Sequence, residues 1–140
     1  MNNSFSPSPD LQQLPWVTVA SISHIGKVRQ ENQDQVLVKT WPNESALLAV
    51  VADGMGGSRG GKRAAELTIE TFEKLIDELD EPLKKSQEDI YQQLLAKFYE
   101  ADEAIRNEGG QSFQLMGMGS TVVAAIITPD YYVHLYAGDS

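Results

Sequence analysis

A continuous apolar run that stops at a carboxylate is the feature that most constrains the fold of this chain. Residues 46–52 (ALLAVVA) are uniformly apolar, have the length of one strand and are followed by Asp53. They predict a strand buried on both faces, because a strand with one solvated face alternates apolar and polar side chains. The five glycines within residues 54–61 predict a loop, since glycine is unfavourable inside a helix. The carboxylate is therefore expected where a buried strand opens onto a glycine-rich loop.

The rest of the chain divides into strands and helices by the spacing of its apolar residues. Ala65, Ile69 and Phe72 begin a stripe with steps of four and three, which predicts a helix. The expected elements are strands at residues 16–23, 35–40, 120–127 and 131–137, and helices at residues 62–79 and 87–108. The last two strands are close enough to form a hairpin, and the short joint between the helices predicts an antiparallel pair. This order favours an α+β fold with antiparallel sheets.

The two ends of the sequence set the expected domain boundaries. Residues 1–15 are rich in Asn, Ser, Pro and Gln, which predicts a disordered lead-in. Residues 16–140 are expected to belong to one domain. Its last strand runs into Gly138-Asp139-Ser140, an unclosed turn that would leave a sheet edge unprotected. The sequence therefore predicts a domain that is truncated at Ser140.

Composition excludes several classes of function. Apolar residues make up 41% and charged residues 22%, which is ordinary for a globular protein. The absence of a signal peptide and of an apolar run near ~20 residues predicts a cytoplasmic protein with no membrane partner. The net charge of −9 disfavours nucleic-acid binding. The sequence has no cysteine, which rules out disulfides, thiolate metal sites and a cysteine nucleophile.

Three polar groups are candidates for chemistry. Asp53 with Gly54 offers carboxylate and backbone oxygens, the ligands that Mg²⁺ or Mn²⁺ prefers, although an aspartate that merely caps a turn is an equal alternative. Arg29 and Asp34 lie in a polar loop, and the planar guanidinium suits phosphate oxygens. A solvated loop with an Arg–Asp ion pair is the alternative there. Asp139 follows an apolar strand and, on pattern alone, is a turn residue.

A second interpretation of the glycine-rich segment is a nucleotide-binding P-loop. Gly56, four further residues and then Gly61-Lys62 nearly match that motif between a strand and a helix. The next position is Arg63, however, and not the Ser or Thr that would hold Mg²⁺. The P-loop is therefore the weaker alternative.

Four motifs in order resemble the metal-dependent PPM family, the protein phosphatase 2C-like enzymes. The motifs are residues 23–29 (SHIGKVR) leading into 32–34 (NQD), 51–57 (VADGMGG) with Gly61 beyond, 117–121 (GMGST) and 137–140 (AGDS). The Asp-Gly-Met-Gly-Gly form resembles the bacterial branch. The resemblance covers residues 17–140 and corresponds to the N-terminal part of the family domain.

The resemblance implies a fold and a site. The fold would be a four-layer αββα sandwich of two antiparallel sheets flanked by antiparallel helices, incomplete in this fragment. The site would hold two, possibly three, Mg²⁺ or Mn²⁺ ions. Asp53 would bridge two metals, the Gly54 carbonyl would bind one, and Asp34 would act near them through water. Arg29 would bind the substrate phosphate, and Asp139 would match the aspartate at the third metal position.

The implied activity is hydrolysis of phosphoserine and phosphothreonine in proteins by a metal-activated water. Two departures matter: Gln33 stands where some members carry Glu, and Met55 stands where eukaryotic members carry His. With its carboxylates incomplete, the isolated fragment is expected to have little or no activity. A non-catalytic interaction module that keeps the fold is the alternative. His24 and His134 match no catalytic role and are expected to serve packing.

Overall fold

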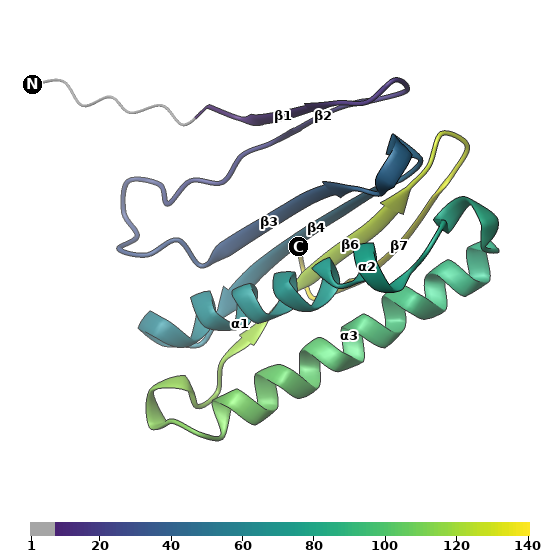
Figure 1. Ribbon diagram of the computed structural model, residues 1–140. Coiled ribbons are helices and arrows are strands. Elements are labelled where there is room, and N and C mark those ends of the chain that lie inside the picture. The colour runs from purple at the N-terminus through teal and green to yellow at the C-terminus, as the bar shows by residue number, and fades with distance from the viewer. Residues whose placement is uncertain (1–7) are drawn as a thin grey trace, which may run out of the picture.

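The computed structural model describes residues 8–140 as an antiparallel sheet covered on one face by two long helices (Figure 1). A separate two-stranded sheet lies on the side away from α3 (Figure 1). The strands are β1 Asp10–Gln13, β2 Thr18–Ser21, β3 Asp34–Thr40, β4 Leu47–Met55, β5 Gly119–Ser120, β6 Val122–Ile127 and β7 Tyr132–Ala137. The helices are α1 Gly57–Glu73, α2 Leu75–Glu78 and α3 Gln87–Gly109, and the 3-10 turns are η1 Pro42–Glu44, η2 Pro82–Lys84 and η3 Phe113–Leu115.

The larger sheet has five strands, and every pairing in it is antiparallel. Its order is β3-β4-β6-β7, with the short β5 paired to the end of β4. The second sheet consists of β1 and β2, also antiparallel. The predicted α+β class with two antiparallel sheets is confirmed, as is the hairpin of the last two strands.

The central strand β4 has one buried face and one partly open face. Leu48, Val50 and Ala52 are buried on the helix side, whereas Val51 on the other side is 44% exposed. The prediction of a strand buried on both faces is therefore wrong at Val51, because helices cover only one face of this sheet. Tyr136, which lies on the same face through the register of β4, β6 and β7, is also exposed.

The core lies between this sheet and the helices. Phe72 and Leu75 come from α1 and α2, Ile90 and Leu94 come from α3, and all four are fully buried. The two long helices run antiparallel, because Arg63 near the start of α1 forms an ion pair with Glu108 near the end of α3. The predicted antiparallel helix pair is confirmed.

The glycine-rich segment after Asp53 is not the predicted loop. The strand β4 continues to Met55, and α1 begins at Gly57, not at residue 62. Close packing explains the glycines inside the helix. A Cβ on Gly60 would lie 2.8 Å from the Met118 Cβ, and one on Gly61 would lie 2.6 Å from the Gln33 side-chain oxygen. Tertiary contact here outweighs the poor helix propensity of glycine.

The expected N-terminal lead-in is partly ordered. Residues 1–7 lie outside the described residues, but β1 falls within the segment predicted to be disordered, so that prediction is wrong for residues 10–13. The Gln12 side-chain amide donates a 2.7 Å hydrogen bond to the Val38 carbonyl, and Leu14 is buried. These contacts hold the polar segment against the larger sheet, which its composition does not reveal.

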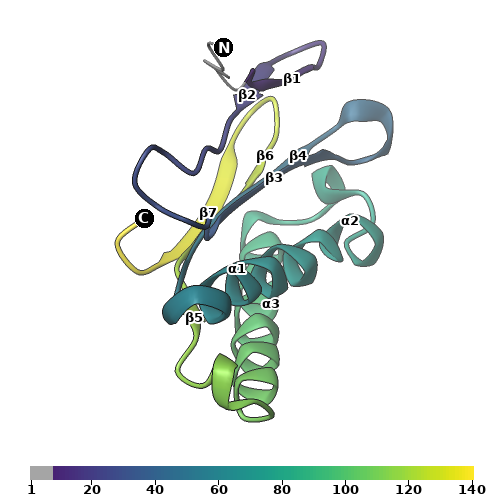
Figure 2. The same cartoon turned by 90° about the vertical axis from the view of Figure 1, so that its left-hand side faces the viewer.

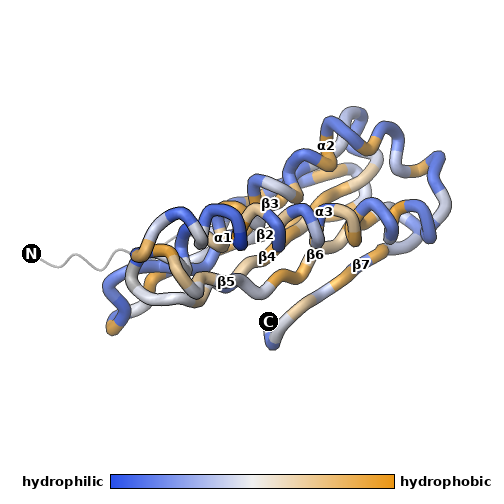
Figure 3. The backbone as a smooth tube through the Cα atoms, turned by 90° about the horizontal axis from the view of Figure 1, so that it is seen from below, coloured by the Kyte–Doolittle hydropathy of each residue, from blue (hydrophilic) through white to orange (hydrophobic). Residues whose placement is uncertain are grey.

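Hydropathy follows the layers of the fold. Figure 3 shows apolar colour along the strands and alternating polar and apolar turns along the helices. This is the pattern of helices with one face packed on a sheet. Among residues 8–140, no helix combines the length and the apolar character needed to cross a membrane.

Candidate metal and phosphate site

Two aspartates face each other at one end of the sheet. Asp34 opens β3 and Asp53 lies near the end of β4, and the two are register partners in the antiparallel pair. Opposed residues project from the same face with Cβ atoms about 5 Å apart. Partial desolvation, a shared hydrogen bond with Asp34 and the charge of Asp34 raise the pKa of Asp53 above its ordinary value. Two like charges held this close favour a bound proton or cation between them.

Thr121 fixes the backbone on which Asp53 sits. The Asp53 N–H donates to the Thr121 Oγ1 (3.1 Å), and the Thr121 N–H donates to the Asp53 carbonyl (2.9 Å). Thr121 is only 4% exposed, and its hydroxyl also shares a hydrogen bond with the Ser140 hydroxyl. Sequence reasoning included Thr121 in a motif but gave it no role. The available signal was its place at the second position of the strand predicted at residues 120–127.

The turn after β7 brings a third aspartate to this end. Gly138 has a φ of +101°, and a Cβ there would lie 2.6 Å from the Thr121 Cγ2, so the position requires glycine. The charge of the next residue, Asp139, contributes to the raised pKa of Asp53. Within residues 8–140, however, no three His, Cys, Asp or Glu side chains are grouped closely enough to hold a metal ion.

The loop between β2 and β3 adds an arginine to the two facing aspartates. Arg29, Asp34 and Asp53 line one pocket together with His24 and Asn32. The positive charge of Arg29 opposes the rise in the pKa of Asp53. The structure therefore places the predicted phosphate-binding and carboxylate residues around the same pocket, although the loop is distant from β4 in sequence.

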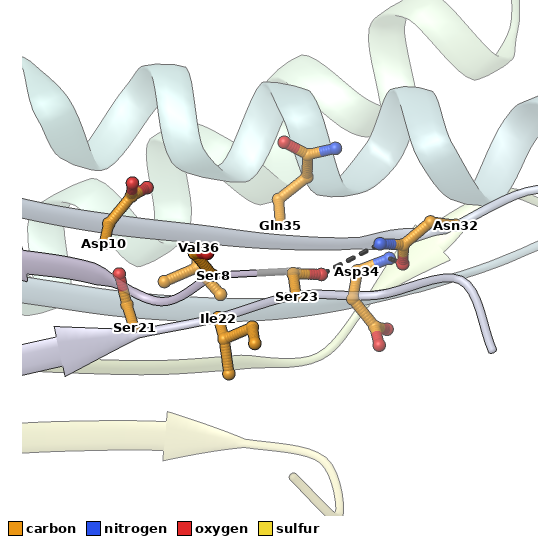
Figure 4. Close-up of a pocket in the computed structure, with 9 residues that line it drawn as sticks. All are labelled: Ser8, Asp10, Ser21, Ile22, Ser23, Asn32, Asp34, Gln35 and Val36. Carbon is orange, nitrogen blue, oxygen red and sulfur yellow. Dashed lines mark hydrogen bonds between the residues drawn. The ribbon is translucent and has the colours of Figure 1, made fainter. Parts of the chain in front are cut away.

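Asn32 shapes the entry of the loop into β3. Its Oδ1 accepts a hydrogen bond from the Asp34 N–H (3.1 Å), and its Nδ2 donates to the Ser23 hydroxyl (2.9 Å), as Figure 4 shows. His24 accepts a hydrogen bond from the Gly26 N–H through Nδ1 (2.9 Å), within the same loop. These bonds hold the two ends of the loop and orient Asp34.

Gln33 joins the loop to the start of α1. Its side-chain Nε2 donates to the Gly57 carbonyl at 2.6 Å, and its own carbonyl accepts from the Gly54 N–H at 3.0 Å. Gly54 is buried here, and a Cβ on it would lie 1.8 Å from the Gly61 carbonyl oxygen. The Gln33 amide thus has a structural partner, and the glycines let β4, α1 and the loop meet.

The P-loop interpretation does not fit this geometry. A P-loop wraps its glycines around a phosphate ahead of the helix. In this chain α1 already begins at Gly57, and Gly60 and Gly61 pack inside it against Met118 and Gln33. The backbone of residues 57–61 is therefore not free to cradle a nucleotide phosphate.

The donor set suits a hard divalent cation. Carboxylate and backbone oxygens are the ligands of Mg²⁺ and Mn²⁺, and a cation would relieve the repulsion between Asp34 and Asp53. The guanidinium of Arg29 in the same pocket suits a phosphate oxygen. The fold and these groups together describe an α+β protein in which two facing aspartates and a nearby arginine are candidates for binding a cation and an anion.

Comparison with known proteins gives the family. A family model described as Protein phosphatase 2C matches residues 23–140, and the chain belongs to this family. The serine/threonine phosphatase stp of Listeria welshimeri is 31% identical over 115 residues, which cover 82% of this chain and 44% of that protein. The serine/threonine protein phosphatase PstP of Mycobacterium tuberculosis is 32% identical over 121 residues, covering 86% and 21% respectively.

Solved structures agree in fold. The crystal structure of the Mycobacterium tuberculosis phosphatase PstP/Ppp matches with a TM-score of 0.71 and 28% identity, over 85% of this chain and 46% of that one. The catalytic domain of PstP in complex with two manganese ions matches with a TM-score of 0.71 and 30% identity, over the same shares. The chain spans less than half the length of these relatives.

Proposed function

We propose that this chain provides the N-terminal part of a metal-dependent phosphatase that hydrolyses phosphoserine and phosphothreonine in proteins. The observation that carries the proposal is the facing pair Asp34 and Asp53 with Arg29 in the same pocket. Family membership and the serine/threonine phosphatases among the relatives support the same activity. The proposed cofactor is Mg²⁺ or Mn²⁺, as two or three ions.

Each site residue has a proposed role that the resemblance to the family implies and that its chemistry allows. Asp53, Asp34 and the Gly54 carbonyl would hold the cations, with Asp139 at a further position. A divalent cation, when bound, lowers the pKa of coordinated water toward neutrality. Arg29 would bind two phosphate oxygens and offset their charge. Thr121 would keep the Asp53 backbone fixed, because it bonds both the N–H and the carbonyl of that residue.

The remaining half of the family domain would complete this site. We propose that further carboxylates come from outside residues 1–140, since the described residues contain no metal-binding group of three. The open face of the larger sheet, which carries the exposed Val51 and Tyr136, is where the rest of the sandwich would pack. Residues 1–140 alone are expected to bind metal weakly and to turn over little substrate.

Metal-dependent turnover tests the proposed activity. The complete domain is expected to release phosphate from a phosphoserine or phosphothreonine peptide when Mn²⁺ or Mg²⁺ is present, and to stop when a chelator removes the ion. Malachite-green detection of phosphate measures the release, and a metal-free sample is the control. No release at any metal concentration by a complete domain would contradict the proposal and favour a non-catalytic interaction module.

Arg29→Ala is expected to act mainly on substrate binding. Loss of a two-point contact with phosphate would raise KM about tenfold, and kcat would fall less, because the groups that hold the cations remain. Steady-state kinetics on a phosphopeptide measure both constants. Lys27→Ala, a nearby cation outside the pocket, is the matched control and should leave KM unchanged. A pure loss of kcat in Arg29→Ala would contradict the assigned role.

A further inference from the structure

Exposed apolar side chains gather at the same end of the molecule as the site. Met55 ends β4, and Phe113 and Met116 lie in the segment between α3 and β5; they are 54%, 88% and 65% exposed. We call these three residues the apolar lip. A contiguous patch of exposed large apolar side chains marks an interaction surface.

The segment that carries the apolar lip is anchored in the fold. Met118 is buried, and it packs so closely on α1 and its approach that a Cβ on Gly56 or Gly60 would lie 2.6 or 2.8 Å from it. The Ser112 hydroxyl accepts a hydrogen bond from the Gln114 N–H (3.3 Å), and the Met118 N–H donates to the Leu115 carbonyl (3.2 Å). Phe113 and Met116 are thus held outward by an anchored backbone, which lowers the entropy cost of binding.

A second pocket is lined by Phe113 of the apolar lip and by residues at the start of α1. Phe113, Gln114 and Arg59 line it, and Gly56 and Gly57 form its other wall. Gln33 belongs to the Arg29 pocket and donates its 2.6 Å hydrogen bond to the carbonyl of Gly57. One hydrogen bond therefore links a residue of each pocket at the start of α1. Figure 2 shows the start of α1 and the strand β5 at the same end of the molecule.

We propose that the apolar lip binds an apolar side chain next to the phosphorylated residue of a protein substrate. The inference rests on the proposed function, because it places the phosphate beside Arg29. An extended peptide advances ~3.3 Å per residue, so a peptide that runs from Arg29 past the Gln33–Gly57 bond would bring a residue close to the phosphorylated one toward Phe113. Arg59, which donates to the Gln114 side chain (3.4 Å), adds a positive charge along this path. The occupant is thus a phosphorylated segment with a flanking apolar residue.

Phe113→Ser in the full-length protein tests this inference. Two substrates are compared: p-nitrophenyl phosphate, which has no flanking residues, and phosphoserine peptides that carry Leu or Ser beside the phosphorylated position. The variant is expected to raise KM about tenfold for the Leu peptide and to leave kcat/KM for p-nitrophenyl phosphate unchanged. The wild type should prefer the Leu peptide over the Ser peptide, and the variant should lose that preference. Leu83→Ser, an exposed apolar residue at the other end of α3, is the matched control.

Three results would overturn the inference, and they separate its failure from that of the proposed function. Unchanged peptide kinetics in Phe113→Ser, with normal turnover of p-nitrophenyl phosphate, would show that the apolar lip does not bind the substrate. The proposed function would be unaffected. A similar loss of activity on both substrates, together with a lower Tm, would show that Phe113 packs against another part of the domain. No turnover of p-nitrophenyl phosphate by the wild type with Mn²⁺ would refute the proposed function and this inference with it.

Discussion

Replacing Asp53 with asparagine in the complete domain is expected to lower metal-dependent turnover by about a thousandfold or more. The side chain keeps its size but loses the charge that would hold two cations, and the metal contribution to such hydrolysis is worth several kcal/mol. Titration calorimetry with Mn²⁺ should show weaker binding in parallel with the lost activity. Asp130→Asn, an exposed aspartate in the turn between β6 and β7, is the control and should be fully active.

The same substitution is expected to stabilise the metal-free protein. In the wild type Asp53 faces Asp34 and has a raised pKa, so the folded state binds more protons than the unfolded state between 3.8 and that raised value. The contribution of Asp53 to the free energy of unfolding therefore falls as pH rises through that window. At neutral pH the ionised Asp53 destabilises the metal-free folded state to its full extent. An asparagine amide could donate to Asp34 instead, which favours folding by about 1 kcal/mol.

Thermal unfolding with and without Mn²⁺ distinguishes the two effects of Asp53→Asn. Without metal, the Tm of the variant should exceed that of the wild type at pH 7, and the difference should shrink toward pH 4. With Mn²⁺, the wild type should gain Tm and the variant should gain little, because a ligand stabilises only the state that binds it. A lower metal-free Tm with unchanged Mn²⁺ binding would mean that Asp53 caps a turn and holds no ion.

The layers of the fold were predictable because they follow from local periodicity. The stripe that begins with Ala65 and Phe72 placed the first long helix, and the apolar strands gave the antiparallel hairpin of β6 and β7. The boundaries around Gly57 failed for a physical reason. Glycine lowers helix propensity locally, but Met118 and Gln33, far away in sequence, pack where a Cβ would stand. No local rule contains that contact.

The residue types of the candidate site were predictable from the sequence, but the contacts that hold these residues in place were not. Asp53 follows a conspicuous apolar run, so its unusual position is visible in sequence. Its pairing with Asp34 depends on the register of β3 and β4, and its hydrogen bonds with Thr121 depend on the antiparallel pairing of β5 with the end of β4. Each of these contacts joins segments that are remote in sequence. These contacts could be expected only from the resemblance to the family, and not from the local sequence.

Gly54→Ala is expected to be the most destabilising single change near the site. Its Cβ would lie 1.8 Å from the Gly61 carbonyl oxygen, 2.4 Å from the Gly61 carbonyl carbon and 3.0 Å from the Gln33 carbonyl oxygen. All three are backbone atoms, so β4 and α1 must separate. Overpacking of this kind lowers the free energy of unfolding by about 3 kcal/mol. Urea denaturation of the metal-free protein measures the loss.

Two further glycine-to-alanine variants give a scale for the loss of stability expected in Gly54→Ala. Gly61→Ala meets the end of the Gln33 side chain, which can rotate away, so the expected cost is about 1 kcal/mol for the lost bond to Gly57. Gly110→Ala has no atom closer than 3.5 Å and should stay within about 0.5 kcal/mol of wild type. Equal stability of all three variants would contradict the close approach of α1 to β4. Because that approach also holds Gln33 beside Asp34, the order of the losses should recur in metal-dependent activity.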